Sequence, residues 1–193
     1  MAGQITFRGV ARAALSGDND AASSCAPVNE AELPSELLTG NAHLDVEHGL
    51  LMGNIQGLRK ICIDHRNLPH CGGCQHERRL CCENELVAML GDLLAFILDH
   101  FRNEERIMRE SLLQVIDREV CEAHMEDHAA ISGKIQEIVA ALDQMKTVSL
   151  IRELDSLLSR WVRNHIMLHD RLLARWIERE DSMLRRSLPP AVI

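Results

Sequence analysis

The chain has 193 residues, of which 46% are hydrophobic and 26% charged, so it can bury a core and form one domain. Its 29 acidic residues outnumber its 21 lysines and arginines. The net charge of −8 argues against a nucleic-acid-binding surface, which needs clustered positive charge. No apolar run approaches the roughly 18 residues that span a membrane. Arg8 and Arg12 interrupt the stretch where an export signal has its apolar centre, so we expect a cytoplasmic protein without membrane contact.

Residues that break helices are distributed unevenly along the chain. No proline lies between Pro69 and Pro189, and only Gly91 and Gly133 fall after Gly73. A long stretch of this kind, rich in leucine, glutamate, arginine and alanine, is typical of an all-α protein. The chain also has 10 histidines and 7 cysteines. An odd cysteine count without an export signal favours metal or redox chemistry over a disulfide framework.

In chain order, residues 1–36 come first, and their weak apolar pattern predicts a flexible N-terminal segment. Segments with helical periodicity follow at about 42–63, 83–109, 116–145 and 148–182. In each of them, apolar residues recur at steps of three and four, as on the seam of a helix that packs in a bundle at a small crossing angle. We therefore expect an all-α, up-down-up-down antiparallel four-helix bundle over residues 37–182 and a C-terminal tail over 183–193.

Polar residues occupy six seam positions where apolar residues are expected. These residues are His48, His100, Glu104, His124, His128 and His165. Burying a polar group without a partner costs about 1–3 kcal/mol, so six of them would consume most of a typical folding stability of about 5–15 kcal/mol. In helices of alternating direction all six fall in one layer near one end of the bundle. A metal ion that they share would satisfy them together.

The sequence around these positions resembles the hemerythrins, and more closely the bacteriohemerythrins. The resemblance covers residues 38 to about 176, and four segments carry it. They are LLTGNAHLDVEHGLL around His48, HFRNEERIM from His100, HMEDH from His124 to His128, and WVRNHIMLHD ending at Asp170. The resemblance implies two irons in a four-helix bundle. One iron is held by His124, His128 and His165, the other by His48 and His100, and both are bridged by Glu104 and Asp170.

The implied ligand set suggests what the site binds. Five imidazoles, two bridging carboxylates and a bridging oxo or hydroxo group leave one position open on the iron with fewer histidines, and in this family O2 binds there reversibly. The resemblance thus implies a non-haem di-iron protein for O2 carriage, storage or sensing, as a monomer or weak oligomer. Two alternatives remain open. One is a redox- or iron-responsive regulator that uses the cysteines described below, and the other is a di-iron oxidase or peroxidase.

Helical spacing and the resemblance disagree at the end of the fourth segment. From His165 the same-face position of an α-helix is His169 at i+4, whereas Asp170 at i+5 lies about 140° round the helix. The family pattern uses the aspartate, so we expect Asp170 at the site. A local widening of the helix, such as a π-bulge, would turn it inward.

An apolar wall should separate the site from water. Candidates for this wall are Ile55, Ile97, Phe101, Leu168 and Leu172. Phe101 and Trp161 either pack beside the ligands or serve only as core residues, and the sequence leaves both open.

A cysteine-rich insertion over residues 62–82 links the first two helical segments. It combines a CxxC unit with further cysteines and histidines, which indicates a zinc site. The candidate ligands are Cys71, Cys74, Cys81 and one of Cys62, His65 or His76. A redox-active thiol pair and a small apolar corner of reduced cysteines are the alternatives. Because His48 precedes Cys62 by fourteen residues on one helix, we expect the insertion about 21 Å from the iron site.

Overall fold

The computed structural model describes residues 32–62, 66–143 and 145–187. Within these ranges the chain is helical and has no strand, which confirms the all-α class. The main helices are α1 (Ala42–Ile61), α2 (His76–Glu110), α4 (Arg118–Ala140), α5 (Thr147–His165) and α6 (Arg171–Ser187). Shorter elements are 3₁₀ turns at Ser35–Leu37 and Cys71–Gly73, the one-turn helix α3 (Leu113–Ile116) and a π turn at Ile166–Asp170. None of the described helices combines the length and hydropathy needed to cross a bilayer.

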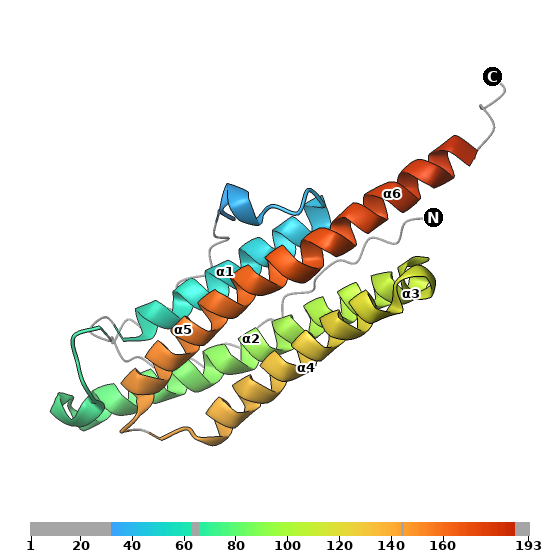
Figure 1. Cartoon of the computed structure of the whole chain (residues 1–193). Coiled ribbons are helices and arrows are strands. Elements are labelled where there is room, and N and C mark those ends of the chain that lie inside the picture. Colours follow the sequence, from blue (N-terminus) through green and yellow to red (C-terminus); the bar gives the residue numbers. More distant parts are fainter. Residues whose placement is uncertain (1–31, 63–65, 144, 188–193) are drawn as a thin grey trace, which may run out of the picture.

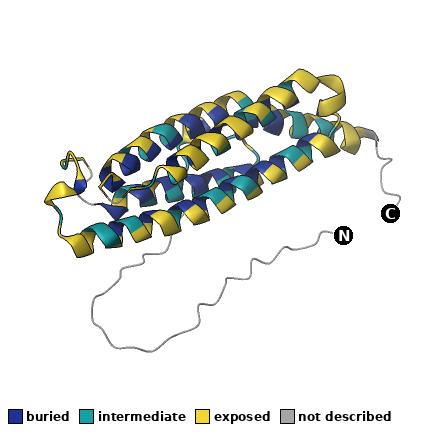
Figure 2. Cartoon of the chain, turned by 90° about the horizontal axis from the view of Figure 1, so that it is seen from below, coloured by how far each residue is buried: buried dark blue, intermediate teal, exposed yellow. Residues whose placement is uncertain are grey.

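The long helices form a bundle. Helix α1 packs against α2 and α5, and α4 packs against the same two helices from the other side. Figure 1 shows consecutive long helices running in alternating directions, with α6 continuing the line of α5 beyond the bundle. In Figure 2 the buried residues follow the inner faces of the helices and the exposed residues follow the outer faces. The seams therefore meet in one interior, as their periodicity predicts.

The N-terminus of helix α1 is capped by a side chain. The side chain of Asn41 accepts hydrogen bonds from the backbone N–H groups of His43 and Leu44, at 3.0 and 3.2 Å. These two bonds satisfy backbone N–H groups that have no partner within the first turn of the helix. Gly40 precedes the cap with a φ of +86°, a conformation that favours glycine. The predicted stripe of this segment, from Leu44 to Leu58, is buried.

Helix α2 begins at His76, earlier than the start near residue 83 that the apolar pattern predicts. The polar run from His76 lacks glycine and proline, and Glu77 in the first turn suits the positive end of the helix dipole. An apolar pattern misses such a start because these residues are solvated. The second half of the insertion, including Cys81 and Cys82, is thus part of α2 and not of a loop.

Helix α4 ends at Ala140 and not near residue 145. Beyond it, the Asp143 side chain accepts a hydrogen bond from the Met145 N–H at 2.9 Å, and the Asp143 carbonyl accepts one from the Lys146 N–H at 2.8 Å. These bonds close a turn that replaces the next helical turn. Met145, the last residue of the predicted segment, is 47% exposed.

The last helical segment is continuous but not uniform. A π turn at Ile166–Asp170 joins α5 to α6, as the widening hypothesis requires. A π turn holds more residues than an α turn, so the buried seam moves along by one position beyond it. Leu173 and Ala174 are buried there, whereas Leu168 and Leu172 are 68% and 41% exposed. Their assignment to the seam, and to the apolar wall of the site, is therefore wrong.

Residues 1–31 of the predicted flexible N-terminal segment and residues 188–193 of the predicted C-terminal tail lie outside the described residues. Ser35–Leu37 forms a 3₁₀ turn, and Leu37 is buried in the main apolar cluster. At the other end α6 continues to Ser187, past the boundary predicted at residue 182.

Candidate metal centre

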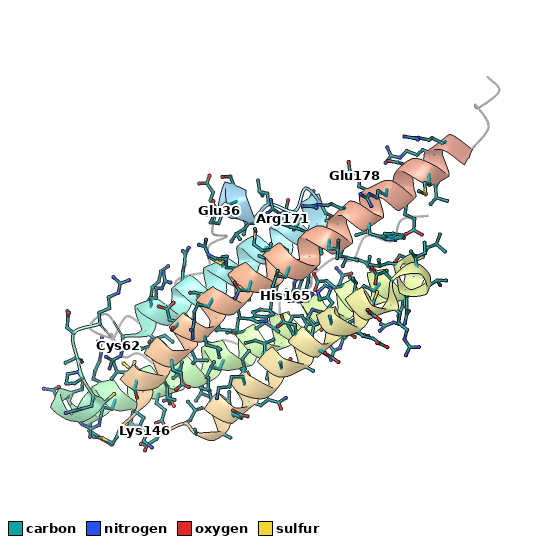
Figure 3. All side chains as sticks on the ribbon, in the orientation of Figure 1. Glu36, Cys62, Lys146, His165, Arg171 and Glu178 are labelled. Carbon is teal, nitrogen blue, oxygen red and sulfur yellow. The ribbon has the colours of Figure 1, made fainter. Side chains whose placement is uncertain are left out.

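A layer of buried polar residues crosses the bundle between two apolar clusters. The larger cluster includes Ile97, Ile131 and Leu158, and the smaller one is formed by Met108, Leu113, Cys121 and Leu173. The polar layer contains all seven residues predicted as iron ligands, each 0–3% exposed. They are His48 on α1, His100 and Glu104 on α2, His124 and His128 on α4, His165 at the end of α5, and Asp170 in the π turn. In Figure 3 the labelled His165 lies in the interior between the long helices.

Three histidines present the same ring nitrogen to a common point. His165 Nε2 lies 3.3 Å from His124 Nε2 and 3.3 Å from His128 Nε2. Glu104 Oε2 completes the group at 3.1 Å from His128 Nε2 and 3.4 Å from His124 Nε2. Ligands at right angles around a cation held at about 2.1 Å are about 3 Å apart, so these spacings suit one bound cation.

A second group lies beside the first and shares its carboxylates. His48 Nε2 is 2.9 Å from Asp170 Oδ2, and His100 Nε2 is 3.6 Å from Glu104 Oε1. The other oxygen of Asp170, Oδ1, is 3.2 Å from His124 Nε2 and 3.0 Å from His165 Nε2. Each carboxylate therefore presents one oxygen to each histidine group, which is the arrangement of two bridging ligands.

Unsatisfied buried atoms test whether these residues fit a cation. In the described part of the chain, seven buried side-chain nitrogen and oxygen atoms lack a hydrogen bond of proper geometry, and six belong to this layer. They come from His48, His100, Glu104 and Asp170, and the seventh is on Trp176. Buried polar atoms are normally paired, so such a concentration points to a missing partner. Imidazole nitrogens and carboxylate oxygens suit iron and other first-row cations.

The π turn decides which side chain of the last helix reaches the layer. Asp170 is fully buried, although it lies five residues after His165. His169, the α-helical choice, is half-buried and stacks its ring on His124 with centroids 4.9 Å apart. It belongs instead to a peripheral group with Asp127 and His165. Because of the π turn, the carboxylate of Asp170 reaches the buried layer in place of the imidazole of His169.

Carboxylates outside the layer hold three of the rings. Glu47 Oε2 lies 2.8 Å from His100 Nδ1, Asp127 Oδ2 2.7 Å from His165 Nδ1, and Glu105 Oε1 3.3 Å from His128 Nδ1. Each can accept the Nδ1 proton, which leaves the Nε2 lone pair directed inward. The sequence predicted no role for Glu47, Asp127 or Glu105. Their one signal is adjacency to a ligand, since all three neighbour one in sequence.

Aromatic side chains pack against the histidines. Phe101 stacks on His128 with ring centroids 3.7 Å apart, and Trp161 stacks on His165 at 4.8 Å. The Trp161 indole N–H also donates to Asp127 at 2.8 Å. Phe101 and Trp161 therefore lie beside the candidate ligands, which answers the question that the sequence left open. Ile55 and Ile97 are buried on the side of the larger cluster, as expected of a wall.

The charges in the layer shift the pKa values of its members. Burial raises the pKa of Glu104, as does the nearby Asp170, but the His100 charge and hydrogen bonds from His124 and His128 bring it well below its usual range. For Asp170, burial is outweighed by the Nε2 atoms of His124, His165 and His48, which lie 2.9–3.2 Å from its oxygens, and the pKa is again well below normal. Burial opposes protonation of His165, yet hydrogen bonds to Asp127, Asp170 and Glu104 raise its pKa to about 11.

Without a bound cation, this network should make the fold most stable between about pH 4.5 and 6.5. Ionised Glu104 and Asp170, whose pKa values are lowered, stabilise the fold at pH values above the ordinary pKa of a carboxyl group. This contribution is lost as pH falls below about 4.5. His165, with a raised pKa, stabilises it fully below about 6.5 and progressively less as pH rises toward 11. Thermal unfolding of chelator-treated protein from pH 3 to 10 measures this. A midpoint that keeps rising above pH 7 would contradict it.

The predicted cysteine ligands lie at the other end of the bundle. Cys62, Cys71 and Cys74 line a cavity there, together with Cys82. Cys81 does not line it, being exposed and directed at Glu85. His76 is exposed and does not line the cavity either, and His65 lies outside the described residues. Three of the four cysteines predicted as ligands thus line one cavity, but they are not among the described groups whose ligand atoms all lie within 4.8 Å of one another.

Comparison with known proteins agrees with the site. Neither the curated proteins nor the solved structures give a match to this chain. A family model does match, that of the hemerythrin HHE cation-binding domain, over residues 39–177. The matched range includes all seven residues of the buried layer and most of the chain, so the chain belongs to the hemerythrin family of cation-binding helical domains.

Proposed function

We propose that this chain holds two iron ions and binds O2 reversibly, for carriage, storage or sensing. His124, His128 and His165 would hold one iron, His48 and His100 the other, and Glu104 and Asp170 would bridge them. The observation that carries the proposal is the shared pair of carboxylates, each with one oxygen near each histidine group. When bound, the two irons would supply electrons and an open position for O2.

The unequal histidine groups support binding of a small ligand at one iron. The group of His48 and His100 has one imidazole fewer than the other. An iron bound there would have one of its six coordination positions open for a further ligand. His48 is fully buried and His100 is 2% exposed, so the ligand would have to be small.

The surrounding side chains favour retention of a bound ligand over its reaction. Glu47, Asp127 and Glu105 fix the orientation of three rings through Nδ1, so the Nε2 donors need not reorganise. Ile55, Ile97 and Phe101 exclude water from one side of the layer. A dry apolar wall limits the supply of protons, which an oxidase or a peroxidase needs.

Metal analysis combined with optical spectroscopy tests this function. We expect about two irons per chain and, on adding O2 to the anaerobic diferrous protein, an absorption band that persists and reverses when O2 is removed. A sample reconstituted with redox-inert Zn²⁺ is the control and should show no band. Rapid bleaching with turnover of a reducing substrate would favour the oxidase or peroxidase alternative. Absence of iron after reconstitution would overturn the proposal.

A further inference from the structure

A cavity of about 380 Å³ lies at the end of the bundle opposite the histidine layer. Cys62, Cys71, Cys74 and Cys82 line it, and so do Arg78 and Arg79. Figure 3 shows the labelled Cys62 near one end of the bundle, the same end as Lys146, and away from His165. Fourteen residues of helix α1 separate His48 from Cys62, a rise of about 21 Å. The cavity is therefore separate from the proposed iron site.

The four cysteines come from three elements that meet at this end. Cys62 follows the last residue of α1, and Cys82 lies in α2 with its Sγ 3.5 Å from the Ile61 carbonyl oxygen. Cys71 opens the 3₁₀ turn, where its Sγ accepts a hydrogen bond from the Val148 N–H of α5 at 3.4 Å. Cys74 closes that turn through its N–H, which donates to the Cys71 carbonyl at 3.1 Å. The sulfurs thus face one cavity from the ends of α1 and α2 and from the turn between them.

Gly72 and His70 shape the turn that carries the CxxC unit. The Gly72 N–H donates to His70 Nδ1 at 3.0 Å, so His70 caps the turn and does not face the cavity. A Cβ on Gly72 would lie 2.7 Å from the same nitrogen, so a side chain at this position would displace the His70 ring. The turn therefore holds Cys71 and Cys74 on one side, with no histidine among the cavity residues.

We propose that Cys62, Cys71, Cys74 and Cys82 form a tetrathiolate site for Zn²⁺. Four thiolates are the ligand set of structural zinc sites. Zinc with four thiolates carries a charge of −2, and the two arginines of the cavity balance it. The Arg78 side chain lies beside Cys82, so its positive charge faces the cysteine cluster.

The proposal differs from the sequence-based ligand set at one position. Cys81 and Cys82 are adjacent on α2, so their side chains point about 100° apart. Cys82 is 8% exposed and lines the cavity, whereas the Cys81 Sγ is exposed and lies 3.5 Å from Glu85 Oε1. Only Cys82 is placed to act as the fourth ligand.

The size of the cavity allows the sulfurs to close on an ion. A zinc tetrahedron with bonds of about 2.3 Å holds its sulfurs about 3.8 Å apart. The four cysteines line the cavity wall but are not among the described groups whose ligand atoms all lie within 4.8 Å of one another, so zinc binding would have to draw the sulfurs inward. Cys62 and Cys74 lie at element ends, where small backbone shifts are easiest. A disulfide between Cys71 and Cys74 would use only two of the four thiols and leave Arg78 beside Cys82 unexplained.

Zinc content of the full-length protein and of two single variants tests the site. We expect about one zinc per chain in the wild type. Cys82→Ser should lower zinc content at least about tenfold, and the matched control Cys81→Ser should keep it. Because the two sites share no ligand, both variants should bind iron as the wild type does. Zinc retained in Cys82→Ser or lost in Cys81→Ser would overturn the assignment.

A second measurement keeps the proposal testable if Cys82→Ser fails to fold. Adding Co²⁺ to chelator-treated wild type should produce the intense sulfur-to-cobalt absorption of tetrahedral thiolate sites, and Zn²⁺ should displace it. Thiol counting should show four cysteines protected by Zn²⁺ and released by chelator. Absence of the cobalt band, or a mass lower by two hydrogens that shows a Cys71–Cys74 disulfide, would overturn the zinc site.

Discussion

Replacing Glu104 with alanine is expected to remove iron from both halves of the site. One oxygen of Glu104 lies near the histidine pair and the other near the histidine trio, so no other residue of α2 can replace it. Its loss would also leave the buried histidines with a single shared carboxylate, Asp170. Iron content after reconstitution should fall at least about tenfold, and the O2-dependent absorption should disappear. Iron analysis and optical titration with O2 measure both effects.

The neighbouring glutamate provides the control for this experiment. Glu105 is half-buried and lies 3.3 Å from the outer nitrogen of His128, where it orients the ring of a proposed ligand without reaching the shared centre. Glu105→Ala should therefore weaken iron binding by no more than about 10–100-fold and reach nearly full occupancy at excess iron. Circular dichroism should show that both variants remain helical. Two irons and an unchanged spectrum in Glu104→Ala would refute the bridging role.

The second large effect concerns the π turn. Asp170→Ala should abolish the O2-dependent absorption and release iron first from the histidine pair. That side has only His48 and His100 besides the shared carboxylates. His169→Ala, one residue earlier, should keep both irons because this ring packs beside His124 and His165 without occupying the position of Asp170. The comparison decides between α-helical spacing, which favours His169, and the π turn, which turns Asp170 inward.

Both variants should be compared at equal iron and O2 concentrations, with iron analysis beside the optical spectrum. His169 is half-buried and contacts two other rings, so its loss should lower the thermal midpoint modestly while the spectrum stays in place. The opposite pattern, with iron lost in His169→Ala and kept in Asp170→Ala, would show that the imidazole is the ligand.

The sequence alone was sufficient for the features that depend on regular helical spacing. Steps of three and four residues predicted the helices, and six polar residues on the same seams predicted one buried layer. This works because an α-helix advances about 100° per residue, so spacing determines which residues share a face. Asp170 was the exception, because it breaks this spacing and only the family resemblance pointed to it.

The tertiary structure determined which side chains are buried or exposed where the helical spacing is irregular or where residues distant in sequence meet. The π turn shifted the seam after His165, burying Leu173 and Ala174 and exposing Leu168 and Leu172, because packing against the other helices overrides local geometry. It also brought Glu47, Asp127 and Glu105 to the outer faces of the histidine rings. In the cysteine insertion no periodicity guided the prediction, and the early start of α2 directed Cys82 into the cavity and Cys81 to solvent. Side-chain direction at such points depends on where an element begins and on what packs against it, and both are set by contacts distant in sequence.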